Sequence, residues 1–357
     1  MRYRKTMRKT SSTRTNLPQI IKPGDIHRFH AALAEWYATH GRHTLPWRQT
    51  DDPYHIWVSE VMLQQTQVAT VLDRFYFPFL ESFPTIQHLA KAPREKVMKA
   101  WEGLGYYRRA GFLHEAAKRT HNGLPEDVEG LTDLPGIGRN TAHAILAFAH
   151  HRPVAILEAN VKRVVARIFA LTAPKEDALW AGAEALLNTR HPFDYNQAMM
   201  DIGSMVCTPK APDCPACPAN IICKGQANPE SYPAPKAKKK TPTRHVNLIV
   251  REDAMGRLYL EKRSDALLGG LWGFPQSTDT VGEAIGHITH IYTHFRLEGL
   301  VYLQETPKPQ RGAGWFTRNE IAALPLSKLD HKILKLMDAR HSAAGKPQKA
   351  RPPRRGH

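Results

Sequence analysis

The chain has 357 residues, of which 42% are hydrophobic, and its formal net charge at pH 7 is +17. This length and apolar content allow two domains with sizeable cores, and they exclude a chain that is disordered throughout. No run of about eighteen apolar residues is present, and the N-terminus lacks the apolar core of a secretory signal, so we expect an intracellular protein without a membrane partner.

The basic charge is concentrated at the two ends and in one internal stretch. Seven Lys and Arg residues precede the first acid, Asp25, six follow the last acid, Asp338, and five more lie between 236 and 244. These eighteen charges exceed the whole surplus, so we expect the folded parts to be close to neutral. Basic arms of this kind suit a polyanion such as DNA, although they also occur as solubilising tails without a specific partner.

Changes in composition divide the chain into five segments. We expect a basic tail at 1–24, a helical part at 25–224, a Pro- and Lys-rich linker at 225–243, a second domain with strands at 244–340 and another basic tail at 341–357. The predicted fold class is therefore multidomain, with an all-helical part followed by an α/β part.

The first informative segment in chain order is a predicted helix that begins near Ser59. Glu60, Gln64 and Gln67 follow one another at helical spacing, away from its apolar side. As a pattern alone, Glu60 would be a first-turn acid that suits the helix dipole. The neighbouring amides of Gln64 and Gln65 could read base edges or fill the gap left by a displaced base.

The stretch LPGIG at 134–138 is predicted to be a tight turn that opens the next helix. The two glycines let the backbone approach a ligand, and a helix N-terminus offers N–H groups to a phosphate, although such a turn often has no ligand. Further along, a strand-like apolar run ends at Leu157, and Glu158 stands directly before a basic helix start. The plain interpretation of Glu158 is an acid that pairs with Lys162 or Arg163.

All four cysteines of the chain lie within seventeen residues, at Cys207, Cys214, Cys217 and Cys223. Intracellular proteins seldom use disulfides, so this clustering predicts four thiolates around one metal centre. Zinc and an iron–sulfur cluster both satisfy that donor set. Because four protein ligands leave no open position for substrate, we expect the centre to be structural.

The C-terminal part is predicted to contain strands and one closing helix. The stretches VNLIV at 246–250 and RLYLEKR at 257–263 are expected to form a hairpin, with a further strand near 297–303. The closing helix carries Leu329 and Ile333 at helical spacing.

Several segments closely resemble the adenine DNA glycosylase, or MutY, family of the helix-hairpin-helix glycosylase superfamily. They are LPWR at 45–48, VSEVMLQQTQVATV at 58–71, GLGYYRRA at 103–110, LPGIGR at 134–139, NQAMMDIGSMVC at 196–207 and the cysteine loop at 207–223. The resemblance implies a helical domain with a 4Fe–4S cluster rather than zinc, and the stretch ALLGGLWGFPQ at 266–276 resembles a Nudix-like C-terminal domain. It further implies removal of adenine mispaired with 8-oxoguanine or guanine in double-stranded DNA. We expect a monomer in the cytoplasm of a bacterial-type cell, on the nucleoid when bound to DNA.

The resemblance also implies roles for individual residues. Glu60 would protonate adenine, Glu158 stands where the family has a second catalytic carboxylate, an aspartate, and Asn160 would orient this carboxylate or a water. The glycine that follows the aspartate in the family is Ala159 here. The implied DNA contacts are Trp47 and Arg48 for the flipped adenine, Gln65 as a wedge in the duplex, Tyr106 beside the lesion, Pro135, Gly136 and Gly138 at a phosphate, and Thr293 and His294 at 8-oxoguanine. Gln64 is a further candidate DNA contact through its amide alone.

Two further positions separate subclasses of the superfamily. Asn140 stands where bifunctional endonuclease III-like relatives carry a lysine nucleophile, which implies a glycosylase without efficient strand cleavage. His143 stands where MutY relatives commonly have glycine. Two alternatives remain open: an endonuclease III-like pyrimidine glycosylase and lyase, and a lesion-binding protein whose catalysis is impaired by Glu158.

Overall fold

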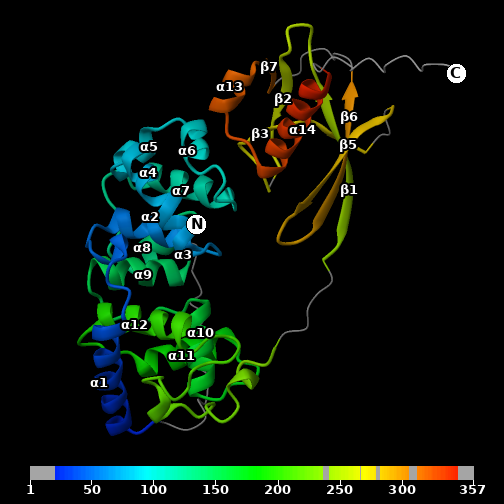
Figure 1. Cartoon of the computed structure of the whole chain (residues 1–357). Helices are drawn as coiled ribbons and strands as arrows, with labels where there is room; N and C mark the ends of the chain where they lie inside the picture. The colour runs from blue at the N-terminus through cyan, green and yellow to red at the C-terminus, as the bar shows by residue number, and fades with distance from the viewer. Residues whose placement is uncertain (1–20, 236–240, 266, 279–281, 305–311, 345–357) are drawn as a thin grey trace, which may run out of the picture. The chain divides into compact units, whose positions relative to one another are not determined.

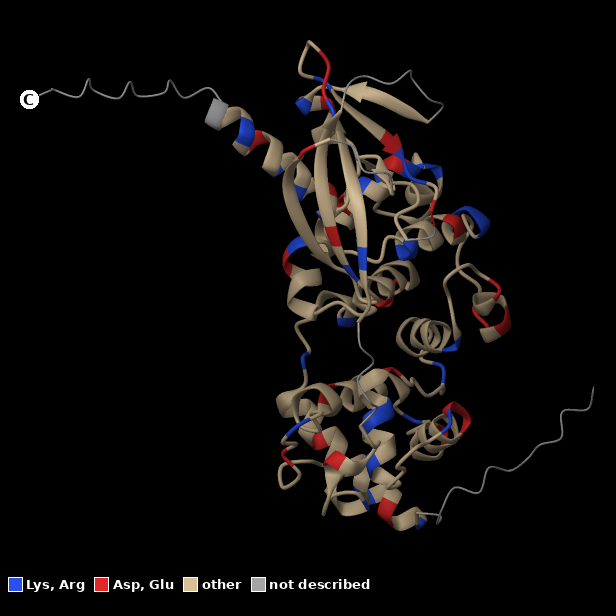
Figure 2. Cartoon of the chain, turned by 90° about the vertical axis from the view of Figure 1, so that its right-hand side faces the viewer, with Lys and Arg blue, Asp and Glu red and all other residues tan. Residues whose placement is uncertain are grey.

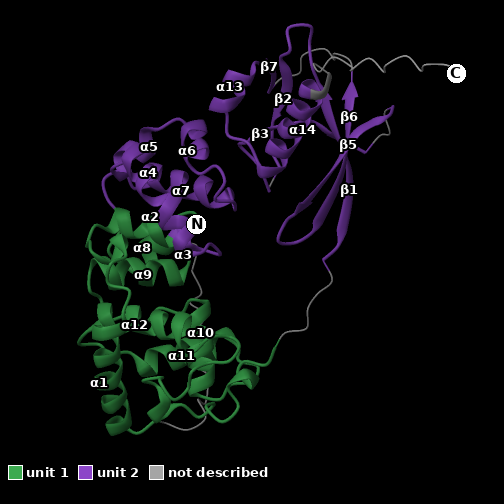
Figure 3. Cartoon of the chain, in the orientation of Figure 1, with its two compact units in different colours: residues 1–60, 124–237 green, residues 61–123, 238–357 purple. Residues whose placement is uncertain are grey.

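The computed structural model describes residues 21–235, 241–265, 267–278, 282–304 and 312–344. Most of both predicted basic tails, and the lysines at 236–240, lie outside the described residues. The chain forms two compact units, one from residues 1–60 and 124–237 and one from residues 61–123 and 238–357 (Figure 3). These units group the chain differently from the five segments expected from composition, whose boundaries stay a prediction.

Helices dominate the first unit, as expected for this part of the chain (Figure 1). The core of the unit contains Phe29, Val165, Leu186 and Ile202, all fully buried. These residues come from α1, α10, α11 and α12, which pack together in one hydrophobic cluster. The helical elements are α1 (Pro23–His40), η1 (Pro46–Arg48), α2 (Pro53–Leu63), α8 (Val128–Thr132), α9 (Arg139–Ala149), α10 (Ala159–Ile168), α11 (Glu176–Leu186), α12 (Pro192–Met205), η2 (Asn220–Ile222) and η3 (Pro229–Ser231).

The helix predicted to begin near Ser59 begins at Pro53 instead, and it ends at Leu63. Proline suits the first turn of a helix, and the Asp52 carboxylate accepts the N–H of Tyr54 at 2.8 Å, which satisfies one of the free donors there. The predicted start was therefore wrong by six residues.

This earlier start changes the place of the polar residues that follow. Glu60 lies in the last turn of α2, not the first, while Gln64 and Gln65 lie in the turn before α3 (Val68–Arg74). Gln65 has a left-handed backbone with φ of 58°, which a helix cannot continue through. The predicted row of Glu60, Gln64 and Gln67 on one helical face was therefore wrong.

The second unit combines helices from residues 61–123 with the C-terminal α/β part. Its remaining helices are α4 (Tyr76–Ser82), α5 (Ile86–Lys91), α6 (Arg94–Ala100), α7 (Arg108–Arg119), α13 (Arg318–Ala323) and α14 (Lys328–Ala344). A four-stranded sheet has the order β4-β1-β6-β5, and a three-stranded sheet has the order β3-β2-β7. Leu248 and Val250 of β1 pack with Leu329 and Ile333 of α14, so the closing helix covers a sheet face as its apolar spacing predicts.

The strand bounds confirm the predicted strands but not their pairing. The strands are β1 (Thr243–Arg251), β2 (Leu258–Lys262), β3 (Trp272–Gly273), β4 (Gln276–Ser277), β5 (Ala284–Ile291), β6 (Arg296–Gln304) and β7 (Ala313–Phe316). The ladder expected between β1 and β2 was wrong, because these strands belong to different sheets. The turn between them is closed by an antiparallel bridge of Glu252 with Leu258 and by the N–H of Asp253 donating to the carbonyl of Arg257. Both edges of β1 are already occupied, since it pairs antiparallel with β4 and parallel with β6.

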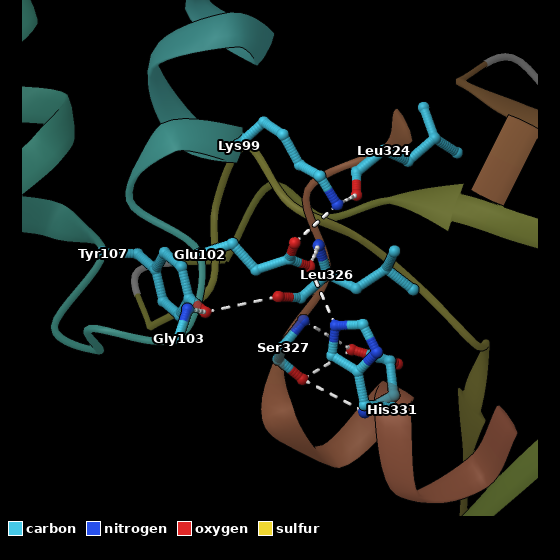
Figure 4. A network of polar contacts seen from close by, with 9 residues as sticks. Lys99, Glu102, Gly103, Tyr107, Leu324, Leu326, Ser327 and His331 are labelled. Carbon is cyan, nitrogen blue, oxygen red and sulfur yellow. Dashed lines mark hydrogen bonds and ion pairs between the residues drawn. The ribbon is translucent and has the colours of Figure 1, made fainter. Parts of the chain in front are cut away.

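Within the second unit, a polar network around Glu102 connects the end of α6 with the start of α14 (Figure 4). The Glu102 carboxylate accepts the N–H of Leu326 at 2.9 Å and lies 2.9 Å from Nε2 of His331. The hydroxyl of Tyr107 donates to the carbonyl of Leu326 at 3.2 Å. The network therefore holds the loop before α7 against the α/β part of the same unit.

Basic and acidic residues are interspersed along the described helices and strands, which fits the expectation of folded parts with little net charge (Figure 2). Among the described residues, no helix is both long and apolar enough to cross a membrane.

Candidate active site

Glu60 lies half-buried in the last turn of α2, next to the buried side chains of Val61 and Met62. Burial and the negative charge of Glu158 together raise the pKa of Glu60 to about 7, against an opposing effect of Arg48. The C-terminal end of a helix is the negative end of its dipole, so it further disfavours a carboxylate here. Glu60 is therefore able to hold a proton near neutral pH.

Glu158 is the N-cap of α10. Its carboxylate accepts the backbone N–H groups of Asn160 and Val161, both at 2.9 Å, and the side-chain amide of Asn160 at 3.3 Å. A helix N-terminus with three N–H donors is a favourable place for negative charge. Glu158 and Glu60 thus occupy opposite electrostatic surroundings within one unit.

The plain interpretation of Glu158, an acid paired with Lys162 or Arg163, does not match the contacts of these cations. Lys162 pairs with Glu176 at 2.6 Å. Arg163 donates to the amide oxygen of Asn160 at 2.9 Å and to the carbonyl of Cys207 at 2.8 Å. Asn160 therefore links the capped carboxylate to a fixed arginine, which suits an orienting role.

Ala159, in place of the glycine of the family, is the first residue of α10 and is exposed. It has no positive φ, so its methyl group introduces no backbone strain. The close approach in this region is made by Gly203 of α12 instead, where an added Cβ would lie 2.8 Å from Cβ of Asn160.

Arg48 forms a two-fold ion pair with Asp201, with N–O distances of 2.7 and 2.8 Å. Asp201 is fully buried and also binds the side chain of Arg42. Burial by itself would raise the pKa of Asp201. The hydrogen bonds and positive charges of Arg48 and Arg42 outweigh this effect, so the pKa of Asp201 is lowered. Asp201 was not among the predicted site residues, although it lies within the NQAMMDIGSMVC stretch, and it fixes the guanidinium that was expected to bind adenine.

Trp47 is buried in η1, with 5% of its surface exposed. This exposure suits a core aromatic side chain, and its place at a flipped adenine stays a prediction.

Gln65 and Tyr106 are both exposed, and both have the left-handed backbone conformation that side chains other than glycine seldom adopt, with φ of 58° and 50°. Strained residues of this kind persist where the surroundings hold them, and they cluster at functional sites.

The residue that holds both strained loops is Arg109, which sequence reasoning did not single out. Its guanidinium donates to the carbonyls of Val61 and Gln64, both at 2.7 Å, and to that of Gly105 at 3.1 Å. The same group lies 5.2 Å from the ring centre of Tyr106. Burial lowers the pKa of Arg109 to about 10, which leaves the guanidinium charged at neutral pH, and backbone carbonyl oxygens are its main hydrogen-bond acceptors.

A cavity of about 270 Å³ in the second unit brings together Tyr106, Thr293 and His294. The hydroxyls of Tyr106 and Thr293 lie 2.8 Å apart and hydrogen-bond. Thr293 and His294 are exposed in the turn between β5 and β6, and not within a strand. Three of the predicted lesion contacts therefore lie at one cavity.

The turn at 134–138 lies between α8 and α9, as predicted. Gly136 has φ of 79° and is exposed, and Gly138 caps α9. Pro135 precedes them half-buried. Glycine is required at 136 by its backbone conformation.

The four cysteines are free of disulfides and line one small cavity together with Arg167. Within the described ranges, no three His, Cys, Asp or Glu side chains stand at ready-made metal-binding distances. The donor set still fits a cluster in kind and place, because four sulfurs face a common space and Arg167 donates to Sγ of Cys207 at 3.2 Å.

Comparison with known protein families identifies both parts of the chain. Residues 58–187 match the model of the HhH-GPD superfamily of base excision DNA repair proteins, and residues 245–336 match the NUDIX domain model. Both parts of the predicted fold class are thereby confirmed. Proteins of the endonuclease III type within this superfamily typically carry a 4Fe–4S cluster.

Similar proteins and structures agree with these matches. The adenine DNA glycosylase of Buchnera aphidicola subsp. Baizongia pistaciae is 36% identical over 70% of this chain and 73% of its own length. The human adenine DNA glycosylase is 29% identical over 93% of this chain and 80% of its own length. The structure of a thermostable thymine-DNA glycosylase superposes with a TM-score of 0.53 and 27% identity, over 57% of this chain and 97% of that one. These findings show that the chain belongs to the adenine DNA glycosylase family, whose members are hydrolases that cleave N-glycosidic bonds in DNA.

Proposed function

We propose that this protein is a monofunctional glycosylase that flips adenine out of double-stranded DNA and excises it. The observation that carries the proposal is the pairing of Glu60, whose pKa is raised to about 7, with Glu158, whose carboxylate is held by N–H donors. One group can give a proton near neutral pH while the other supplies a fixed negative charge. Cleavage of a glycosidic bond needs this division of roles.

In the proposed reaction, the carboxylic acid of Glu60 gives its proton to the adenine ring. The bond between adenine and C1′ then breaks, its electron pair leaves with the base, and adenine departs as a neutral molecule. The positive charge that develops on the sugar is stabilised by Glu158. Water adds to C1′ and loses a proton to the solvent, which leaves an abasic site.

Asn140 supports cleavage of the base without cleavage of the strand. A lyase needs an amine that attacks C1′ and forms a Schiff base. The amide of Asn140 cannot do so, and its oxygen already accepts the N–H of Leu157 at 2.8 Å.

We infer that the preferred substrate carries adenine opposite 8-oxoguanine or guanine. The cavity at Tyr106 and Thr293 supports this finer assignment, because its lining combines the hydrogen-bonded hydroxyls of these two residues with His294. The hydroxyl of Thr293 can both donate and accept, and His294 adds a second polar edge.

The 4Fe–4S cluster is part of the proposal, with Cys207, Cys214, Cys217 and Cys223 as its ligands. When bound, the cluster would join the four thiolates into one rigid loop and contribute folding free energy. Arg167 would hold that loop through the sulfur and carbonyl of Cys207, at 3.2 Å each. We expect the protein to act as a monomer.

The test is single-turnover release of adenine from a duplex with one A:8-oxoguanine pair, using cluster-loaded protein. Duplexes with A:G, A:T and thymine glycol serve as controls. We expect release from A:8-oxoguanine and A:G, with the former faster, and an intact strand at the abasic site.

Two outcomes would contradict the proposal in different ways. Tight binding of the A:8-oxoguanine duplex without release of adenine would favour a lesion-binding protein with impaired catalysis. Release from thymine glycol with strand cleavage would favour an endonuclease III-like enzyme.

A further inference from the structure

The segment that leads into Glu158 is extended but belongs to no sheet among the described residues. Ala155, Ile156 and Leu157 are each at most 2% exposed. A buried backbone without a sheet partner leaves N–H and C=O groups that must be satisfied by other means.

Three side chains satisfy four of these groups. Asn196 of α12 accepts the N–H of Ile156 at 3.0 Å and donates to the carbonyl of Val154 at 2.9 Å. His143 and Asn140, both on α9, bind the next two groups. Nδ1 of His143 lies 2.7 Å from the carbonyl of Ala155, and the amide oxygen of Asn140 accepts the N–H of Leu157 at 2.8 Å.

His143 and Asn140 lie three residues apart and therefore on one face of α9. The carbonyl of Ala155 can only accept, so Nδ1 of His143 carries the shared hydrogen. Burial lowers the pKa of His143 and so disfavours the charged ring. The ring also meets Trp180 edge-on, with 5.2 Å between ring centres, which fixes its orientation. The histidine is therefore a rigid donor.

We propose that Asn140 and His143 are positioning residues that set the place of Glu158 by fixing the extended segment immediately before it. The inference rests on the proposed function, because it gives Glu158 a part in adenine excision. Asn140 acts one residue before the carboxylate and His143 three residues before it. The two residues thus fix the backbone next to Glu158, whose carboxylate reaches one methylene farther than the aspartate of the family.

The decisive experiment is a double-mutant cycle between Asn140→Leu and Glu158→Gln. Asn140→Leu removes the acceptor for Leu157, and we expect single-turnover adenine release to fall about 10- to 100-fold, since displacements of about 1 Å have effects of this size. Affinity for the uncleaved duplex should stay within about threefold of the parent value, because Asn140 is not among the predicted DNA contacts. In the Glu158→Gln background, Asn140→Leu should slow adenine release by less than about threefold, because the carboxylate that Asn140 positions is already absent.

The matched control uses the buried histidine of the second unit. His114 is 1% exposed, and its Nε2 lies 3.0 Å from the carbonyl of Ala92, which makes it a counterpart of His143. His143→Leu and His114→Leu should lower the melting temperature similarly, but only His143→Leu should slow adenine release in folded protein. Asn140→Asp keeps the acceptor oxygen, so it should lose less activity than Asn140→Leu even if the latter folds poorly.

Each failure has its own signature. If Glu158→Gln releases adenine at the parent rate, the role proposed for Glu158 is wrong. If Glu158→Gln is inactive but Asn140→Leu and His143→Leu both keep the parent rate, the positioning role is wrong while the proposed function stands. Equal losses from Asn140→Leu in both backgrounds would also overturn positioning, because they indicate a general structural effect.

Discussion

The negative charge of Glu158 raises the pKa of Glu60, so the two carboxyl groups of the candidate site are coupled. Burial makes the larger contribution, and together they bring the pKa of Glu60 to about 7, whereas Glu158 is held by N–H donors at the start of α10. Two acids of similar intrinsic strength thereby stand in different surroundings, which is the basis of the different tasks that we propose for them.

This coupling predicts the pH dependence of excision. Because the proton-bearing form of Glu60 is the reactive one, the single-turnover rate should be constant below pH 7 and should fall about tenfold for each pH unit above it. Glu158→Gln removes one of the two raising effects, so any residual activity should begin to fall at a lower pH. A rate that increases from pH 6 to pH 8 would remove Glu60 from the acid role.

Glu60→Gln should abolish excision but retain binding, and it should also stabilise the fold at high pH. Between pH 4.5 and 7 the folded state keeps a proton that the unfolded state has lost, so the free energy of unfolding decreases as pH rises through this window. The amide of Gln in the Glu60→Gln mutant does not titrate, so its free energy of unfolding does not decrease in this window. We expect the mutant to be more stable by about 2 kcal/mol at pH 8 and equally stable at pH 4.

Denaturant unfolding of both proteins at the two pH values measures this difference. Glu115→Gln, on the surface of α7, is the control and should show no comparable gain. Equal stability of the parent and Glu60→Gln at pH 8 would show that Glu60 carries no buried charge.

Glu158→Asp should keep the cap of α10, since aspartate is also a good N-cap residue, and the free energy of unfolding should change by less than about 0.5 kcal/mol. Excision should slow by about tenfold, because the carboxylate withdraws by one methylene from the place that the segment before it sets. Single-turnover kinetics and thermal unfolding measure the two effects. Faster excision by Glu158→Asp would instead support the impaired-enzyme interpretation.

Thr293→Val should weaken recognition of the base opposite adenine. It removes the hydroxyl that forms a hydrogen bond with Tyr106. The loss of one hydrogen bond corresponds to about a tenfold change in the dissociation constant at most. Binding of A:8-oxoguanine and A:G duplexes, measured in the Glu60→Gln background, should show reduced discrimination. Thr289→Val is the control, because this hydroxyl of β5 bonds Glu298 and does not line the cavity.

Cys217→Ser should lower the iron content of the purified protein and its melting temperature together, since the cluster would tie the four-cysteine loop to the first unit. Iron analysis and thermal unfolding test this. Thr208→Val is the control, because it changes the same loop without removing a sulfur. A Cys217→Ser protein that holds iron and melts like the parent would contradict the assigned ligand.

Local patterns in the sequence predicted the parts of the fold that depend on neighbouring residues. The turn at Gly136 was predicted by its glycines, and Gly136 does have a positive φ. The start of α10 was predicted by the acid Glu158 standing before a helical pattern, and Glu158 is its N-cap. The helix around Glu60 shows the limit of this approach. Its apolar spacing continues through Gln64 and Gln65, but Pro53 sets its start and the left-handed Gln65 follows its end.

The features that the sequence did not reveal depend on partners far apart in the chain. Asp201 binds Arg48 across 153 residues, and Arg109 binds the carbonyl of Val61 across 48. A periodic pattern carries no information about such contacts. The separation of β1 from β2 also depends on a distant partner. The strand β1 pairs with β6, which lies far beyond the turn that suggested a hairpin.

The dependence of two exposed loops on Arg109 has a genetic consequence. One guanidinium supports the loops of both Gln65 and Tyr106, so a single missense change at codon 109 would release both loops at once. Arg109 is buried and also binds the carbonyl of Val61, which follows Glu60 directly, so such an allele would also lower the stability of the fold. One inherited change would thus combine a smaller amount of folded protein with the loss of both loop conformations, although it lies outside the two carboxylates and the four cysteines.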